Sequence, residues 1–234
     1  QIHGIPADIT GENRTGSCGV AVIWSAVTTT DCTFSALEVD HPSGSEFLIG
    51  TTPVTYTATD TEGNQTVASF LVTVEDVEAP LLANMPENIE VVAPEGSCEA
   101  TATWSDPTAT DCISYELSSD ALSGDAFPIG ETLVTYTATD PSGNSGTDSF
   151  TVTVLDQEMP LIFQLPSSVQ VDSAPDSCNG VASWSEPDAS DCSGILSLIP
   201  SQSSGSEFPI GTTTVVYTAT DGSGNTSPAS FIVT

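Results

Sequence analysis

Acidic side chains recur in two short motifs, and both could supply oxygen ligands to a metal ion. The motif D-x-x-G-N occurs three times, and the motif V-x-D-x-E-x-P occurs twice. Ca²⁺ takes six to eight oxygens from carboxylates and carbonyls held in adaptable loops. With one further acidic loop residue, these motifs predict Ca²⁺ sites where one structural unit meets the next. The candidate ligands are Asp60, Asp76, Glu78, Asp106, Asp140, Asp156, Glu158 and Asp221.

Each motif also has a purely structural interpretation, which stays open at this point. In a D-x-x-G-N hairpin turn, Asp accepts a backbone hydrogen bond, Gly takes a positive φ, and Asn tolerates a left-handed conformation. Acidic residues at the V-x-D-x-E-x-P segments could simply protect exposed sheet edges from pairing with other chains.

The charge balance excludes several classes of partner. The 234 residues include 32 Asp and Glu, no Lys and a single Arg, for a formal net charge of −31. No basic surface exists to displace phosphate counterions, so a nucleic-acid binder is excluded, and docking on an anionic membrane is disfavoured. No apolar run approaches 18 residues, so we expect no membrane insertion by this segment. Hydrophobic residues make up 38% of the chain, which favours a folded β-protein over a disordered acidic tail.

The chain is a threefold internal repeat. Trp24, Trp104 and Trp184 are spaced 80 residues apart, and the cysteines share this spacing. We therefore predict three domains, at residues 1–80, 81–160 and 161–234, with almost no linker between them. The last strand of the third unit is cut short at Thr234, so we expect the chain to be a window from a longer array.

Each unit is predicted to be all-β. Val54–Thr59 alternates apolar and polar residues with period two, and Ser69–Val74 supplies a second strand after a short turn. Both segments recur in the other two units, and residues 21–24 predict a third strand. About seven short strands in 80 residues are typical of an immunoglobulin-like β-sandwich. The predicted fold is three tandem immunoglobulin-like sandwiches in an elongated array.

The six cysteines are expected to form disulfides. Two cysteines lie 14 residues apart in each unit, which favours pairing within the unit over the other arrangements among 15 possible ones. Each bond would close a loop of about 15 residues and contribute about 3 kcal/mol in the chain-entropy model. Zinc-bound thiolates are the disfavoured alternative, because only two His are present. Disulfides indicate an oxidising compartment, hence a secreted or cell-surface protein. The predicted pairs are Cys18–Cys32, Cys98–Cys112 and Cys178–Cys192.

The repeated sequence resembles a known family. The string F-P-I-G-x-T-x-V-x-Y-x-A-T-D-x-S-G-N, followed by S-F-x-V-T-V-x-D-x-E-x-P, is similar to the HYR (hyalin repeat) module. It begins at Phe127 and again at Phe208, while the first unit has F-L-I-G from Phe47. The resemblance implies an immunoglobulin-like fold and a role in cell adhesion or extracellular matrix, as in large secreted bacterial surface proteins. Many such modules carry a cysteine before the Phe of the last strand, where this chain has Ser.

The sequence predicts an extracellular structural or adhesive repeat segment that forms a stalk or filament, in which Ca²⁺ at the domain junctions would add rigidity. The expected partners are neighbouring repeats of the same chain, other copies in a filament, or a cell-surface or matrix ligand. A carbohydrate- or receptor-binding module and a spacer within a larger secreted enzyme are the alternatives. The only non-repeating aromatics that could form a binding platform are Phe34, Tyr115 and Phe163.

No catalytic motif is present, so the segment itself is not expected to be an enzyme. His41 could act as a base for Ser43 or Ser45, but nothing around it recurs in the other units. Three N-x-S/T sequences could accept N-linked glycans in a secreted protein. These predicted sites are Asn13, Asn64 and Asn225.

Overall fold

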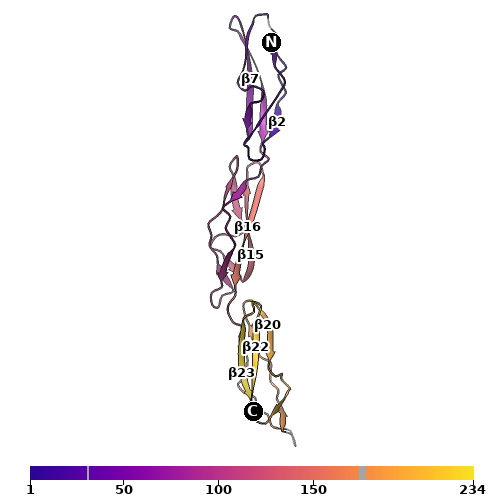
Figure 1. Ribbon diagram of the computed structural model, residues 1–234, viewed down its shortest axis with the longest axis vertical. Helices are drawn as coiled ribbons and strands as arrows, with labels where there is room; N and C mark the ends of the chain where they lie inside the picture. Colours follow the sequence, from indigo (N-terminus) through magenta and orange to yellow (C-terminus); the bar gives the residue numbers. More distant parts are fainter. Residues whose placement is uncertain (31, 174–177) are drawn as a thin grey trace. The chain divides into compact units, whose positions relative to one another are not determined.

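The computed structural model describes residues 1–30, 32–173 and 178–234. Every regular element within these residues is a β-strand (Figure 1). The chain divides into two compact units, each of which holds one outer repeat together with the adjoining end of the middle repeat. The first unit comprises 1–85, 107–120 and 135–148, and the second comprises 86–106, 121–134 and 149–234.

The first repeat is a two-layered β-structure. One layer is a four-stranded sheet in the order β2-β8-β7-β5, in which β2 pairs with β8 in parallel and the other pairs are antiparallel. The second layer consists of two short antiparallel ladders, β1 with β4 and β3 with β6. The strands are β1 (Ile2–His3), β2 (Ile9–Glu12), β3 (Gly19–Ala21), β4 (Thr28–Thr29), β5 (Phe34–Val39), β6 (Glu46–Leu48), β7 (Gly50–Asp60) and β8 (Gln65–Glu75).

The second repeat has the same topology. Its main sheet has the order β10-β16-β15-β13, and the short ladders join β9 to β12 and β11 to β14. The strands are β9 (Leu81–Ala83), β10 (Ile89–Val92), β11 (Glu99–Thr101), β12 (Thr108–Thr110), β13 (Glu116–Ser119), β14 (Ala126–Pro128), β15 (Gly130–Thr139) and β16 (Ser145–Leu155).

The third repeat has the same topology, except that a single β-bridge replaces one edge strand of the main sheet. Its main sheet is β20-β22-β23, and a parallel bridge from Val169 to Val233 stands where the first edge strand lies in the other repeats. The strands are β17 (Leu161–Phe163), β18 (Asn179–Val181), β19 (Asp188–Ser190), β20 (Ile195–Pro200), β21 (Glu207–Pro209), β22 (Thr213–Asp221) and β23 (Thr226–Val233). The predicted all-β tandem sandwich fold is thus confirmed.

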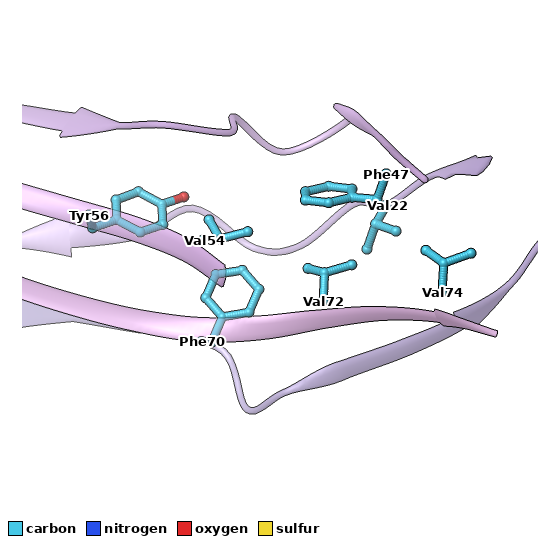
Figure 2. Packing of buried hydrophobic residues seen from close by; sticks show 7 residues of the cluster. All are labelled: Val22, Phe47, Val54, Tyr56, Phe70, Val72 and Val74. Atoms are coloured by element: carbon cyan, nitrogen blue, oxygen red, sulfur yellow. The ribbon is translucent and has the colours of Figure 1, made fainter. Parts of the chain in front are cut away.

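The period-two pattern places alternate residues of the long hairpin in the core. In β7 and β8 of the first repeat, Val54, Tyr56, Phe70, Val72 and Val74 are buried, as Figure 2 shows. Their neighbours in the sequence face the solvent, because successive side chains of a strand point to opposite faces. The five equivalent positions are buried in β15 and β16, and four of them are buried in β22 and β23. The predicted strand at 21–24 is wrong except at Ala21, because β3 covers Gly19–Ala21 and ends there.

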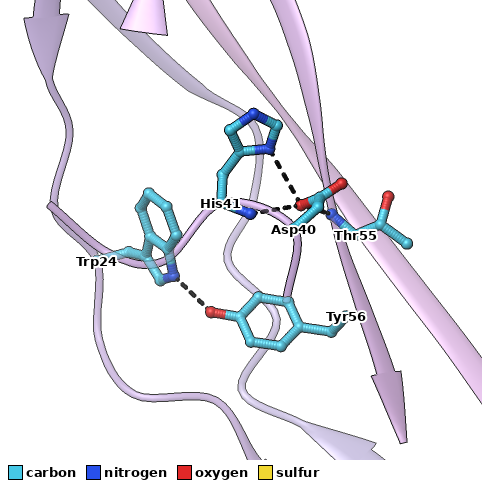
Figure 3. A network of polar contacts seen from close by, with 5 residues as sticks. All are labelled: Trp24, Asp40, His41, Thr55 and Tyr56. Atoms are coloured by element: carbon cyan, nitrogen blue, oxygen red, sulfur yellow. Dashed lines mark hydrogen bonds and ion pairs between the residues drawn. The ribbon is translucent and has the colours of Figure 1, made fainter. Parts of the chain in front are cut away.

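The repeated tryptophan is anchored by its ring and by its backbone. The ring of Trp24 lies 5.2 Å from that of Phe70 at 77°, an edge-to-face geometry that recurs at Trp104 and Trp184. Its Nε1 donates to Tyr56 Oη at 2.9 Å (Figure 3). Its backbone N–H donates to Ser43 Oγ, which in turn donates to the Trp24 carbonyl. Ser123 and Ser204 do the same for the other two tryptophans, so Ser43 is part of a repeated structural contact.

His41, the base considered from the sequence, lies beside Asp40. Its Nδ1 is 3.2 Å from Asp40 Oδ1, the same oxygen that accepts from the amides of His41 and Thr55 (Figure 3). Burial opposes ionisation of Asp40, but the Thr55 amide and His41 together hold the pKa of this carboxyl below its usual range.

Candidate functional site

Two disulfides link consecutive repeats. Cys18 of the first repeat is bonded to Cys112 of the second, and Cys98 of the second is bonded to Cys192 of the third. Both bonds join residues 94 positions apart, with Cα atoms 5.1 Å apart. Each bond lies inside one of the two compact units. Cys32 and Cys178 are free thiols on exposed residues.

The predicted pairing within each repeat is therefore wrong, and strand length explains why. The Cys18 carbonyl accepts from Ile49, just before β7, whereas the Thr33 carbonyl, next to Cys32, accepts from Thr61, just after β7. An 11-residue strand such as β7 spans about 33 Å. Cysteine Cα atoms more than about 7 Å apart cannot be bridged. The 14-residue spacing therefore carries the chain from Cys18, at the end of the sandwich that is bonded to the next repeat, to the opposite end.

Three aspartates converge beside each disulfide. Carboxylate oxygens of the three lie within 4.8 Å of one another in each group. One aspartate comes from the V-x-D-x-E-x-P junction, one directly precedes the second cysteine of the following repeat, and one begins the D-x-x-G-N turn of that repeat. We call these groups the junction triads: Asp76, Asp111 and Asp140 at the first junction, and Asp156, Asp191 and Asp221 at the second.

The triads are well buried for acidic groups. Asp76, Asp140 and Asp221 are 7%, 5% and 0% exposed. Asp76 Oδ1 accepts from Asn13 Nδ2 at 2.9 Å, and Asp76 Oδ2 has no hydrogen-bond donor. Asp111 Oδ2 and Asp156 Oδ2 are likewise buried without a donor. Buried acceptors are normally satisfied, so three orphaned oxygens in two triads require an explanation.

The D-x-x-G-N turns are hairpin turns, as their structural interpretation predicts, and two of them also contact a junction. In the second repeat, Asn144 donates from its backbone and its side chain to Asp140, and its Nδ2 also donates to the Asp76 carbonyl at 3.1 Å. Asn225 makes the matching contact to the Asp156 carbonyl at 3.2 Å. Gly143 has φ = 92°, as predicted for the turn glycine, whereas Asn144 is not left-handed.

Hydrogen bonds favour the ionised state of one aspartate in each triad, Asp140 at the first junction and Asp156 at the second. Burial opposes ionisation of Asp140, but the side chain and amide of Asn144 and the amides of Ser142 and Gly143 outweigh it and lower the pKa of this carboxyl. Burial likewise opposes ionisation of Asp156, whose pKa is lowered by the Ser193 hydroxyl and the Glu158 amide. Two unit charges about 4.8 Å apart repel by about 3.5 kcal/mol at an effective dielectric constant of 20. Each triad is therefore a concentrated negative charge.

Four of the eight predicted ligands belong to the triads, and four lie elsewhere. Glu78 accepts from the Gly16 amide through both carboxylate oxygens at 2.9 Å, and Glu158 accepts from the Gly96 amide. These glutamates therefore hydrogen-bond to the loops that precede Cys18 and Cys98. Asp60 is bonded within its own turn, and Asp106 is exposed.

Asp111 and Asp191 were missed by the sequence reasoning. Their signal was present, because an Asp directly precedes the second cysteine in all three repeats. Its meaning depended on the disulfide pairing, which brings this residue to the preceding repeat.

The predicted glycosylation site at Asn13 is incompatible with the fold. Asn13 is only 5% exposed, its Nδ2 donates to Asp76, and its Oδ1 accepts from the Val77 amide. No room remains for a glycan on this amide. Asn64 is exposed and stays a predicted site, whereas Asn225 is half-buried with its Nδ2 engaged by Asp156 and Asp221.

Comparison with known proteins decides the family. The HYR domain family matches at residues 4–74, 75–154 and 155–234, which together span nearly the whole chain. The chain belongs to the HYR domain family. The HYR repeats are 33% identical to hyalin of Lytechinus variegatus over 93% of this chain and 43% of that protein, and 34% identical to hyalin of Strongylocentrotus purpuratus over 94% of this chain and 19% of that protein.

The HYR repeats also match part of a larger multidomain protein. Over 61% of this chain they are 39% identical to 4% of the sushi, von Willebrand factor type A, EGF and pentraxin domain-containing protein 1 of Rattus norvegicus. The chain thus spans less than half the length of the relatives named here. Among solved structures, mouse cadherin-23 EC22-24 matches with a TM-score of 0.34 and 16% identity, over 100% of this chain and 97% of that one. Within the described residues, no helix is long and apolar enough to cross a membrane.

Proposed function

We propose that this chain is an extracellular adhesive repeat segment that bears tension as part of a stalk or filament, with Ca²⁺ at its junctions. The observation that carries the proposal is the pair of disulfides, because each one covalently joins a repeat to the next. Disulfides persist in an oxidising compartment. The HYR repeats shared with the hyalins support the extracellular setting.

The pairing of cysteines between repeats limits how far the chain can be stretched, which is the property that a load-bearing segment requires. With both bonds intact, the shortest covalent path runs from residue 1 to 18, back from 112 to 98, and on from 192 to 234. That path has 73 of the 233 residue-to-residue steps in the chain. Disulfides within each repeat would instead leave 191 steps, since each would remove only 14.

Force–extension measurement on single molecules tests this proposal. We expect the oxidised chain, held at its ends and fully unfolded, to reach about one third of the length of the reduced chain. The Cys112→Ser, Cys192→Ser variant is the matched control, and its length should not depend on reductant. An oxidised chain that extends to more than about four fifths of the reduced length would contradict the load-bearing role.

Adhesion is tested separately on beads. Beads coated with the oxidised chain should attach to each other or to an extracellular-matrix preparation, and reduced, alkylated chain should attach less. Equal attachment by uncoated beads would remove the adhesive part of the proposal and leave the mechanical part standing.

A further inference from the structure

We propose that each junction triad is a Ca²⁺-binding site, formed by Asp76, Asp111 and Asp140 at the first junction and by Asp156, Asp191 and Asp221 at the second. This deepens the calcium part of the proposed function by naming its ligands. Each triad consists of one aspartate from the junction, one that precedes the disulfide cysteine and one from the D-x-x-G-N turn. The same arrangement therefore recurs at both junctions.

Unsatisfied oxygens inside the triads point to a ligand. Asp76 is 93% buried, and its Oδ2 has no donor although it lies in the first triad. Asp111 Oδ2, in the same triad, is also without a donor, and Asp156 Oδ2 repeats the situation at the second junction. A buried carboxylate oxygen without a donor costs free energy unless a cation meets it.

The protein has almost no cation of its own to offer. It contains no Lys, and its single Arg, Arg14, is an exposed residue. Of the two histidines, His41 lies beside Asp40, and His3 bonds to Thr30. The positive charge that compensates the triads must therefore come from solution.

The chemistry of the triads favours Ca²⁺ over other ions. All three side-chain ligands are carboxylates, and the cysteine next to each site is locked in a disulfide, so the nitrogen and thiolate ligands that Zn²⁺ prefers are absent from the triads. Three carboxylates, a nearby carbonyl such as that of Asp76, and water can reach the six to eight oxygens of Ca²⁺. Mg²⁺ demands a tighter octahedral arrangement and gives up its water reluctantly.

The disulfide and the triad are covalently adjacent. Asp111 precedes Cys112, and Asp191 precedes Cys192. Each bond therefore holds one ligand of the site against a junction contributed by the previous repeat. Reduction should release that ligand and weaken Ca²⁺ binding at least tenfold.

Isothermal titration of the chain with CaCl₂, at fixed ionic strength and after treatment with chelator, tests the inference. We expect two sites in the wild-type chain, one in D111N, one in D191N, and none in the double variant. D60N is the matched control, because Asp60 begins the same turn but belongs to no triad, and it should retain two sites. No saturable binding, two sites in the double variant, or equal binding of MgCl₂ would overturn the proposal.

Thermal unfolding supplies a second readout that a merely structural aspartate would not produce. In chelator, D111N should unfold at a higher temperature than the wild type, because the substitution removes a repelling charge. In saturating Ca²⁺ the order should reverse, because only the wild type gains the full stabilisation from bound ion. A D111N chain that is less stable in both conditions would contradict the assignment of Asp111 as a ligand. Binding without any effect on stretching would leave this site intact and remove Ca²⁺ from the proposed mechanical role.

Discussion

The first and second repeats carry the same D-x-x-G-N turn in different surroundings. Asn64 donates to Asp60 in the way that Asn144 donates to Asp140, with Nδ2–Oδ2 distances of 2.8 Å in both. Only Asn144 also reaches the carbonyl of Asp76, in the junction that precedes its repeat. The turn is thus complete in itself, and the contact to a neighbour is added to it.

The cysteines of these two repeats differ in the same way. Cys112 is bonded to Cys18 of the preceding repeat, whereas Cys32, its counterpart in the first repeat, is free and exposed. Asp31, the counterpart of Asp111, lies outside the described residues. A single repeat therefore carries one cysteine of the disulfide and two aspartates of the triad, and the preceding repeat supplies the other cysteine and the third aspartate.

The largest expected effect is on the disulfide map. A Glu-specific protease should release Cys18 and Cys32 within one peptide, 13–38, and Cys112 within peptide 100–116. We expect these two peptides to be linked before reduction, since Cys18 is bonded to Cys112. Mass spectrometry of unreduced digests makes the measurement.

Two serine variants sharpen this result. Cys112→Ser should separate the two peptides and lower the unfolding temperature, because a bond that closes a loop of about 100 residues contributes about 4.7 kcal/mol in the chain-entropy model. Cys32→Ser should leave the linkage and the unfolding temperature unchanged. A closed ring between Cys18 and Cys32 inside peptide 13–38 would refute the inter-repeat pairing.

A smaller effect should distinguish the two turn asparagines. Asn144→Ala loses the hydrogen bonds to Asp140 and the contact to the Asp76 carbonyl, whereas Asn64→Ala loses only those within its turn. One additional hydrogen bond is worth about 1 kcal/mol. Denaturant unfolding should therefore show Asn144→Ala to be the less stable variant by about that amount. Equal losses would mean that the junction contact contributes nothing.

The smallest expected effect is on the pKa of Asp60, in the D-x-x-G-N turn of the first repeat. The side chain and amide of Asn64 lower the pKa of Asp60 below its usual range. The stability from this ionised carboxyl is present above the pKa of unfolded Asp and is lost as the pH falls through the lower, folded value. NMR titration of Asp60 should show the depressed pKa, and Asn64→Ala should raise it. An unchanged pKa in that variant would show that the turn does not hold the charge.

Much of the fold could be predicted from the sequence because it is repeated and locally encoded. The alternation in Val54–Thr59 predicts β7, and its buried residues are those that the period-two pattern indicates. The site could be predicted only in part. Asp76 and Asp140 stand in visible motifs, but Asp111 could be recognised as their neighbour only once the course of the chain between the cysteines was known.

The sequence by itself determined the three copies, their strands and core, and the excess of negative charge, because these depend on composition and short-range periodicity. Tertiary structure decided which cysteines pair, which aspartates meet, and that Glu78 holds a loop amide. The physical reason is the length of the sandwich. Residues 14 apart in an extended chain are carried to opposite ends of a domain, whereas residues 94 apart meet where one domain ends and the next begins.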